Sequence, residues 1–370
     1  MSRTITNSTF NFDLAIVGGG PAGTAAAITA ARMGAQVVVF EAGDFPRQKV
    51  CGEFVSAESL EALHELLRDV PEAASVLQAA PTIDGVRLYV AGQRIESRVS
   101  PPALSIPRYE LDRLLWLAAQ RAGAVTRPGC EVLSVAGTGP FLLTTAAGEI
   151  HTNCVIVAAG RWSRFRPDLA IPDGSKWIGV KAHFREDGAR KSTDLYFFDH
   201  GYCGVQPVAD GVVNACAMVR SDRARSLAEA LQLHPALAER SRAWQPLTEP
   251  VSTAPLIYRE PEPVRENQAF VGDAAAFIDP FVGDGISIAL RTGRVAGKLL
   301  SKGCESPRGL DTAITSYRRE YEEQFAPLVH SASRIRRALS VPSVLLRAGS
   351  LLLRVPGVIP YMIRKTRQVS

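Results

Sequence analysis

The pattern of apolar and polar positions predicts strands alternating with helices near both ends of the chain. Residues 13–41 form an apolar run, a stretch of small residues at helical spacing and a second apolar run, which predicts strand, helix and strand. Leucines at helical spacing predict helices over residues 56–68 and 105–124. Residues 268–300 read as a strand, a glycine-rich turn and a long helix. Such alternation is typical of an α/β fold with a mainly parallel sheet.

The middle of the chain has a different pattern. Residues 82–99 alternate in polarity, and residues 176–220 are rich in β-branched and aromatic side chains, with Asp210-Gly211 as a predicted hairpin turn. A further helix is predicted over residues 222–243. We therefore expect an antiparallel sheet inserted between the two α/β segments.

The turn after the first strand carries the fingerprint of a dinucleotide-binding unit. Within IVGGGPAGTAAAITAARMGAQVVVFE, Gly18 permits the tight turn, Gly20 lets the backbone approach a pyrophosphate, and Gly23 lets the helix pack on the strand. The N–H groups that begin the helix then face the phosphates, and an acid at the end of the second strand can bind a ribose. The residues predicted to contact the cofactor here are Gly18, Gly20, Pro21, Ala22, Gly23 and Glu41.

Composition narrows the class of protein. The chain has 370 residues, of which 46% are hydrophobic and 21% charged, as in a globular protein. Its six cysteines form no C-x-x-C pair, so we expect neither a metal site nor a disulfide framework. This cysteine usage suits a reducing cytoplasm. The polar start of the chain predicts no signal peptide.

The basic charge is concentrated at the C-terminus. The formal net charge is +5, yet residues 331–370 hold eight Arg or Lys and no acid. A helix is predicted over residues 310–338, and prolines divide the leucine-rich tail that follows. Basic amphipathic segments can lie in a membrane interface, so residues 340–370 are candidates for peripheral membrane contact. The equal alternative is a helical cap that packs on the body. The tail lacks interleaved aromatic residues, so we expect no nucleic-acid partner.

A second glycine-rich turn lies near the end of the α/β pattern. Gly272-Asp273 ends a strand, where the carboxylate can accept hydrogen bonds from polyol hydroxyls. The sequence DPFVGDGI at 279–286 follows, and its two glycines open a helix whose N–H groups could face an electron-rich ring edge. The predicted contacts in this segment are Gly272, Asp273, Gly283, Gly285 and Ile286.

These motifs together resemble those of the FAD-dependent oxidoreductases with the glutathione-reductase-like fold, in the group that holds para-hydroxybenzoate hydroxylase, flavin halogenases and geranylgeranyl reductases. The resemblance covers residues 12–325 and includes Arg108 in IPRYELDRLL and the strand VIVAAGRWSR at 155–164. It implies that the first fingerprint holds the FAD adenosine, that Arg108 lies near the FAD phosphates, and that the second turn holds the ribityl chain. Lys49 and Val132 complete the predicted FAD contacts.

The loop FPRQKVCGE at 45–53 resembles the geranylgeranyl reductase branch, whose members often carry K-x-C-G here. The resemblance places this loop near the flavin ring and makes Cys51 and Glu53 the candidate catalytic residues. Either group could donate the proton that follows hydride delivery to a double bond. The alternative is that Cys51 is a small buried filler and Glu53 a surface acid.

Other features argue against neighbouring activities. Ala159-Gly160-Arg161 stands where aromatic hydroxylases usually show D-G, and the tryptophans form no W-x-W pair typical of flavin halogenases. His183 and His200 either line a substrate pocket or, as we favour, serve as sheet histidines. The aromatic residues Tyr196, Phe197, Phe198 and Tyr202 are most simply core, or else form an apolar substrate wall.

We therefore predict an α/β fold with a three-layer FAD/NAD(P)-binding (Rossmann-like) domain, an inserted antiparallel-sheet substrate domain and a helical C-terminus. The predicted domains are residues 1–80, 101–166 and 262–330 for FAD binding, residues 81–100 and 167–261 for substrate, and residues 331–370 for the basic helical tail.

The predicted function is FAD-dependent oxidoreduction of an apolar small molecule, isoprenoid or polyketide-like, with hydride transfer between flavin N5 and a carbon–carbon bond. A single-component monooxygenase using NAD(P)H and O₂ is the alternative, and a non-enzymatic flavin sensor is a third class that no output domain supports. No second G-x-G-x-x-G exists, so we expect NAD(P)H as a transient reductant or an electron-donor protein as partner.

Overall fold

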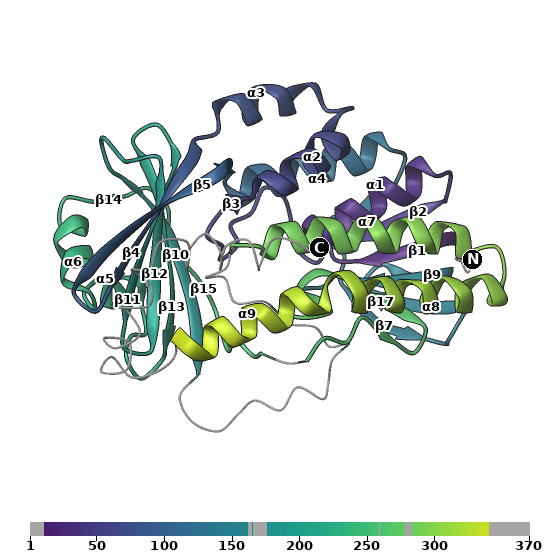
Figure 1. The fold of residues 1–370 in the computed structure, drawn as a ribbon. Coiled ribbons are helices and arrows are strands. Elements are labelled where there is room, and N and C mark those ends of the chain that lie inside the picture. The colour runs from purple at the N-terminus through teal and green to yellow at the C-terminus, as the bar shows by residue number, and fades with distance from the viewer. Residues whose placement is uncertain (1–10, 162–164, 166–175, 259, 278–282, 340–370) are drawn as a thin grey trace, which may run out of the picture.

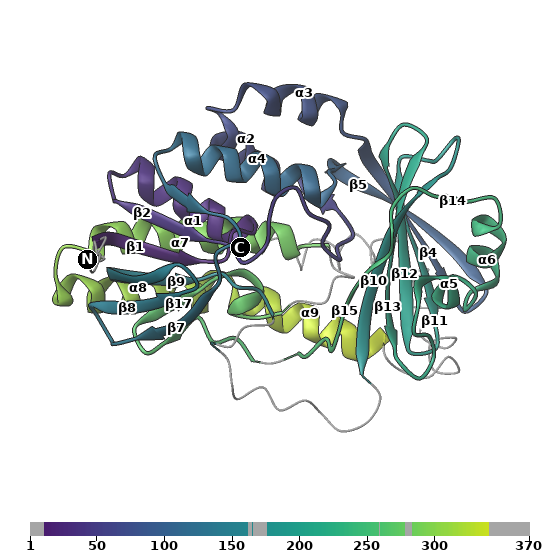
Figure 2. The same ribbon diagram turned by 180° about the vertical axis from the view of Figure 1, so that it is seen from behind.

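The computed structural model describes residues 11–161, 165, 176–258, 260–277 and 283–339. Within these residues the strands form two sheets that lie at opposite ends of the molecule (Figures 1 and 2). The first follows the order β16-β17-β9-β1-β2-β6, with β7 and β8 added beside β9. Its strands are β1 (Asn11–Val17), β2 (Val37–Phe40), β6 (Val125–Arg127), β7 (Val132–Ala136), β8 (Phe141–Thr145), β9 (Gly148–Val157), β16 (Val264–Arg265) and β17 (Gln268–Phe270).

The pairing within this first sheet explains where its loops meet. Strands β2, β9 and β17 run parallel to their neighbours in the β17-β9-β1-β2 series. Their carboxyl ends therefore meet at one edge, which is where open α/β sheets bind ligands. The predicted α/β fold with a Rossmann-like, FAD-binding domain is confirmed.

Helices α1 (Pro21–Arg32) and α7 (Gly285–Gly303) pack tightly against each other because small residues let them approach. A Cβ added at Gly293 would collide with the carbonyl of Ala22, and one at Gly297 would collide with that of Ala26. Helix α7 thus lies directly on α1. The helices are α1 (Pro21–Arg32), α2 (Ala57–Leu67), α3 (Pro71–Ala79), α4 (Arg108–Arg121), α5 (Leu227–Leu231), α6 (Pro235–Ser241), α7 (Gly285–Gly303), α8 (Pro307–Gln324) and α9 (Ala326–Leu339), with the 3₁₀ turn η1 at Gly272–Ala274.

The second sheet has the order β14-β10-β13-β12-β11-β4-β5-β3, with β15 beside β10, and its pairs are antiparallel except β4 with β11. The Asp210-Gly211 turn joins β12 to β13 as predicted. The strands are β3 (Phe54–Val55), β4 (Thr82–Val90), β5 (Gln93–Ser105), β10 (Trp177–Arg185), β11 (Ser192–Phe198), β12 (Gly201–Ala209), β13 (Val212–Arg220), β14 (Gln245–Pro246) and β15 (Val251–Thr253).

Several predicted elements differ from the structure. The helix expected over residues 222–243 is two short helices, α5 and α6, because Pro235 has no N–H for a continuous helix and instead begins α6. The helix expected from residue 105 begins at Arg108, since β5 continues to Ser105. The second sheet therefore crosses the predicted boundary at residue 101, and the division into domains stays a prediction. The tail segment 340–370 and residues 278–282 of the second turn lie outside the described residues.

Candidate functional site

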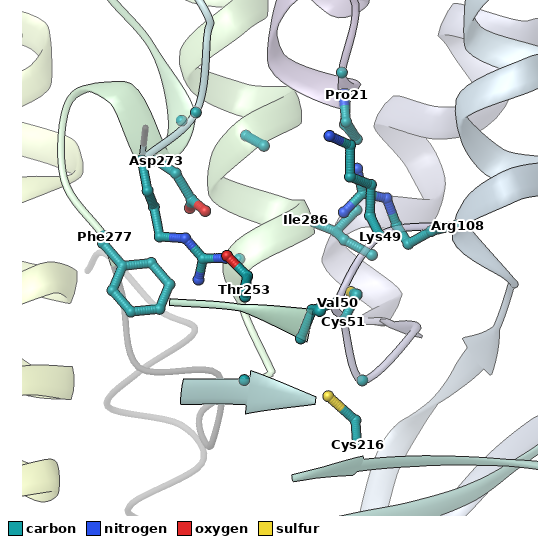
Figure 3. Close-up of a pocket in the computed structure, with 18 of the residues that line it drawn as sticks. Pro21, Lys49, Val50, Cys51, Arg108, Cys216, Thr253, Asp273, Phe277 and Ile286 are labelled. Atoms are coloured by element: carbon teal, nitrogen blue, oxygen red, sulfur yellow. The ribbon is translucent and has the colours of Figure 1, made fainter. Parts of the chain in front are cut away.

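A cavity of about 840 Å³ lies between the two sheets. One side is formed by the carboxyl ends of β1, β2 and β9 and the start of α1, and the other by the inner face of the second sheet. The loop over residues 47–54 completes the wall between them. Figure 3 shows Pro21, Lys49 and Arg108 on one side of this cavity and Asp273 and Phe277 on the other. Every predicted cofactor contact except Gly23 lines the cavity.

The first glycine turn has the geometry that a bound pyrophosphate requires. Gly18 has φ +110°, and a Cβ there would meet the backbone of Ala158. A Cβ at Gly23 would collide with the carbonyl of Gly18, so this glycine sets the approach of α1 to β1. A Cβ at Gly20 would have no protein atom within 4 Å and would project into open space at the head of α1. That space beside free helix N–H groups fits the phosphates of FAD.

The acid predicted to bind a ribose is already oriented. Glu41 accepts hydrogen bonds from the N–H of Gly19 at 2.8 Å and of Gly43 at 3.1 Å, and it pairs with Arg47. Burial acts to raise the pKa of Glu41, but the hydrogen bond and charge of Arg47 and the two N–H groups outweigh it, and the pKa lies below its usual value. Glu41 is therefore an ionised acceptor, and its contact with the adenosine ribose stays a prediction. Arg47 was not among the predicted residues, since only folding brings it beside Glu41.

Two further cations lie at the cavity wall near the head of α1. Arg108 makes two 2.8 Å hydrogen bonds to Asp112, one turn along α4, and this buried carboxylate keeps the pKa of the guanidinium above its usual value despite burial. Burial and the nearby charge of Arg47 lower the pKa of Lys49. Cations beside free helix N–H groups suit a diphosphate, so the donor set fits FAD. The contacts of Lys49 and Arg108 with the cofactor stay predictions.

The second glycine turn meets the first. Gly272 has φ +56°, and a Cβ there would press on Ala22. Its N–H donates to Thr292 Oγ1 at 3.0 Å, which ties the turn to α7. Asp273 lines the cavity, as predicted for a polyol acceptor, and is labelled in Figure 3. Gly283, Gly285, Ile286 and Val132 also line it. The hydroxyl-binding role of Asp273 stays a prediction.

The loop predicted to be catalytic reaches the cavity as well. Cys51 lines the cavity, and its Sγ accepts a 3.3 Å hydrogen bond from the N–H of Glu53. Glu53 is not a surface acid, because its side chain is fully buried. It accepts hydrogen bonds from the N–H of Arg108 and from His183 Nε2, each at 2.8 Å, and pairs with Lys181. Burial acts to raise the pKa of Glu53, but His183 and Lys181 lower it below its usual value.

His183 thus serves as a buried, hydrogen-bonded sheet residue, as favoured from the sequence. His200 lies in the turn between β11 and β12 with φ +59° and is not among the described residues that line the cavity. Lys181 was missed. The signal for it was the pattern VKAHF, in which two polar residues two apart share one face of an otherwise apolar strand.

The rest of the second sheet's inner face is mainly apolar. The predicted aromatic cluster divides between the two faces of the sheet: Phe197 and Tyr202 line the cavity, whereas Tyr196 stacks on Tyr89 with ring centroids 4.3 Å apart. The apolar wall consists of sheet residues Val86, Leu88, Val90, Leu195, Phe197, Tyr202 and Met218, with Leu256 and Phe277 packed beside them from outside the sheet.

Arg161 adds a positive group to this wall. Its guanidinium lies 4.5 Å from the centroid of the Phe277 ring and donates to Thr253 Oγ1 at 3.2 Å.

Comparison with known proteins places the chain in a family. The model of the FAD binding domain family matches residues 11–326. The chain belongs to this FAD-binding family. Menaquinone reductase of Mycolicibacterium smegmatis is 26% identical over 388 residues, covering 95% of this chain and 90% of that protein. Digeranylgeranylglycerophospholipid reductase 2 of Methanopyrus kandleri is 26% identical over 333 residues, covering 85% and 83%.

Solved structures share the fold. A geranylgeranyl bacteriochlorophyll reductase-like protein from Thermoplasma acidophilum has a TM-score of 0.77 at 20% identity and covers 97% of each chain. A flavin-dependent brominase has a TM-score of 0.78 at 18% identity and covers 96% of this chain and 93% of its own. At such identity these structures show the fold and say nothing about halogenation.

These findings confirm the predicted resemblance to FAD-dependent, geranylgeranyl reductase-like oxidoreductases. The protein is an FAD-dependent oxidoreductase. Within the part of the chain that the structure describes, no helix combines the length and apolar character needed to cross a bilayer.

Proposed function

We propose that this enzyme reduces a carbon–carbon double bond of an apolar, isoprenoid-like molecule. The observation that carries the proposal is the apolar wall, which lies across one cavity from the turn that fits the FAD phosphates. Such a wall binds hydrocarbon by removing it from water. The names of the relatives, menaquinone reductase and digeranylgeranylglycerophospholipid reductase, support a substrate with an isoprenoid part.

Bound FAD supplies hydride transfer at N5, and the chain supplies position and a proton. Leu195, Phe197 and Met218 would hold the substrate chain and exclude water. Saturating a double bond adds a hydride to one carbon and a proton to the other, so a proton donor must face the second carbon. The Cys51 thiol at the cavity wall is our proposed donor. Glu53 is the poorer donor because it is ionised and its oxygens already accept hydrogen bonds.

The test is a single-turnover reaction without oxygen. The FAD of the purified enzyme is photoreduced under nitrogen and mixed with a menaquinone or a geranylgeranyl compound. We expect the oxidised flavin spectrum to return and the product to gain one H₂ by mass, a gain that must persist after any quinol has been reoxidised in air. A reaction that requires oxygen and adds an oxygen atom to the substrate would instead establish the monooxygenase alternative. The same assay with NADPH, NADH or a reduced ferredoxin in place of light identifies the electron donor, which we propose to be NAD(P)H or a donor protein.

We also propose peripheral membrane contact through residues 340–370, whose cations alternate with leucines. Deleting this segment is expected to lower co-sedimentation with anionic liposomes at low salt, while neutral liposomes serve as the control. Equal binding by the truncated protein would exclude the tail as the membrane contact. Insolubility of the truncated protein would favour the alternative of a cap packed on the body.

A further inference from the structure

The ammonium group of Lys181 bonds to one loop three times. We name residues 48–53, which carry Cys51, the cysteine loop. Lys181 Nζ donates to Gln48 Oε1 at 3.0 Å and to the carbonyl of Lys49 at 3.4 Å, and it pairs with the carboxylate of Glu53. An ammonium has three N–H donors. Acceptors at the two ends of the cysteine loop together occupy all three. Lys181 itself is 1% exposed.

Neighbouring side chains of the second sheet hold the rest of the cysteine loop. Asn214, which lies opposite His183 in the β10–β13 pairing, donates from Nδ2 to the carbonyl of Cys51 at 3.0 Å. His183 bonds Glu53 from the same strand as Lys181. Glu53 adopts φ +63°, which a non-glycine residue holds only when its surroundings enforce it. The start, middle and end of the loop are thus all fixed to β10 and β13.

Burying the charges of this arrangement lowers the stability of the fold. Glu53 and Lys181 are buried almost completely, and replacing such a pair with neutral side chains of similar size is often neutral or stabilising. The arrangement therefore contributes little to stability that apolar packing could not supply. What it supplies is direction, since the ammonium bonds the Lys49 carbonyl and the Gln48 side chain before Cys51 and the Glu53 carboxylate after it.

We propose that Lys181 is a positioning residue that holds Cys51 at its place in the cavity wall, with Asn214 and His183 as its partners. The inference rests on the proposed role of Cys51 as proton donor. Because β13 also carries Met218 of the substrate wall, the thiol and the substrate are located by the same sheet. Removing the ammonium breaks its bonds to both ends of the loop, while His183 and the N–H of Arg108 still hold Glu53.

The test compares Lys181→Met with Lys176→Met, a matched control at an exposed lysine just before β10. The FAD-loaded proteins are treated with iodoacetamide, and labelling of each cysteine is followed by peptide mass spectrometry. We expect Cys51 in Lys181→Met to react faster by about tenfold or more, the scale of losing one charge-assisted hydrogen bond. Equal labelling of Cys51 in the two variants overturns the proposal.

Two further variants keep the test decisive if Lys181→Met does not fold. Gln48→Ala removes one acceptor at the loop start and should give a smaller increase in labelling. Glu53→Gln with Lys181→Met removes both buried charges, so it should fold while Cys51 still labels fast. Unchanged labelling of Cys51 in both of these variants overturns the proposal.

Steady-state kinetics separate positioning from substrate binding. In Lys181→Met kcat should fall by about tenfold or more while KM changes by less than about threefold, as expected when an interaction acts in the transition state. A rise in KM with kcat unchanged would contradict the proposal. Labelling needs no substrate, so it decides the role of Lys181 even if the proposed reaction is wrong.

Discussion

Replacing Gly20 with valine is expected to abolish FAD binding in a protein that still folds. A Cβ at this position has no protein atom within 4 Å, so the substitution begins in open space rather than against the chain itself. It projects instead into the space beside the first turn of α1, where the pyrophosphate must lie. We expect FAD affinity to fall by about a hundredfold or more. This loss corresponds to the free-energy cost of forcing extra carbon atoms into a site that is already filled. The measurement is FAD content after gel filtration, with circular dichroism as the check on folding.

Gly23→Val is the matched comparison on the same turn. Its Cβ would collide with the carbonyl of Gly18, so this variant should lose thermal stability of the whole protein as well as FAD. The two glycines thus separate a cofactor contact from a packing contact. A yellow Gly20→Val protein with wild-type FAD content would show that the pyrophosphate binds elsewhere.

The parts of the site that the sequence predicted are those with local causes. Gly18 must adopt φ +110°, and Gly272 must adopt φ +56°. Both requirements are met within a few residues of chain, so a strand, a glycine turn and a helix can be read from the printed sequence. The identity of the cofactor followed from these turns and from the family resemblance that they support.

The contacts around Glu53 could not be predicted because they depend on strand register. Lys181 and His183 lie 128 and 130 residues from Glu53 along the chain. Both face the cysteine loop because β10 pairs with β13 such that Lys181 lies opposite Cys216 and His183 opposite Asn214. A slip of one residue would turn them to the other face. The sequence indicated that Glu53 lies near the flavin, but its burial and its ion pair needed the folded chain.

Replacing Cys51 with alanine is expected to slow turnover strongly and to leave FAD binding near wild type. The thiol lines the cavity and accepts a hydrogen bond from the N–H of Glu53, yet its loss removes only one small group from a partly exposed position. If Cys51 delivers the proton, reoxidation of photoreduced flavin by the substrate should slow by about a hundredfold, the scale of general acid catalysis. Anaerobic stopped-flow absorbance measures this rate, and the FAD-to-protein ratio gives the binding control.

Cys216→Ala is the control for a thiol in the same cavity. Burial, with the nearby Cys51, raises the pKa of Cys216 to about 12, so this thiol is a weak acid and a poor proton donor, and the proposed reaction gives it no part. We expect Cys216→Ala to turn over near the wild-type rate.

Glu53→Gln is the companion test, because the amide keeps the shape of the side chain and removes its charge. A larger loss in Glu53→Gln than in Cys51→Ala would assign the acid role to the carboxyl group. Normal turnover in both would mean that the cysteine loop only covers the flavin, since neither group would then be the source of the proton.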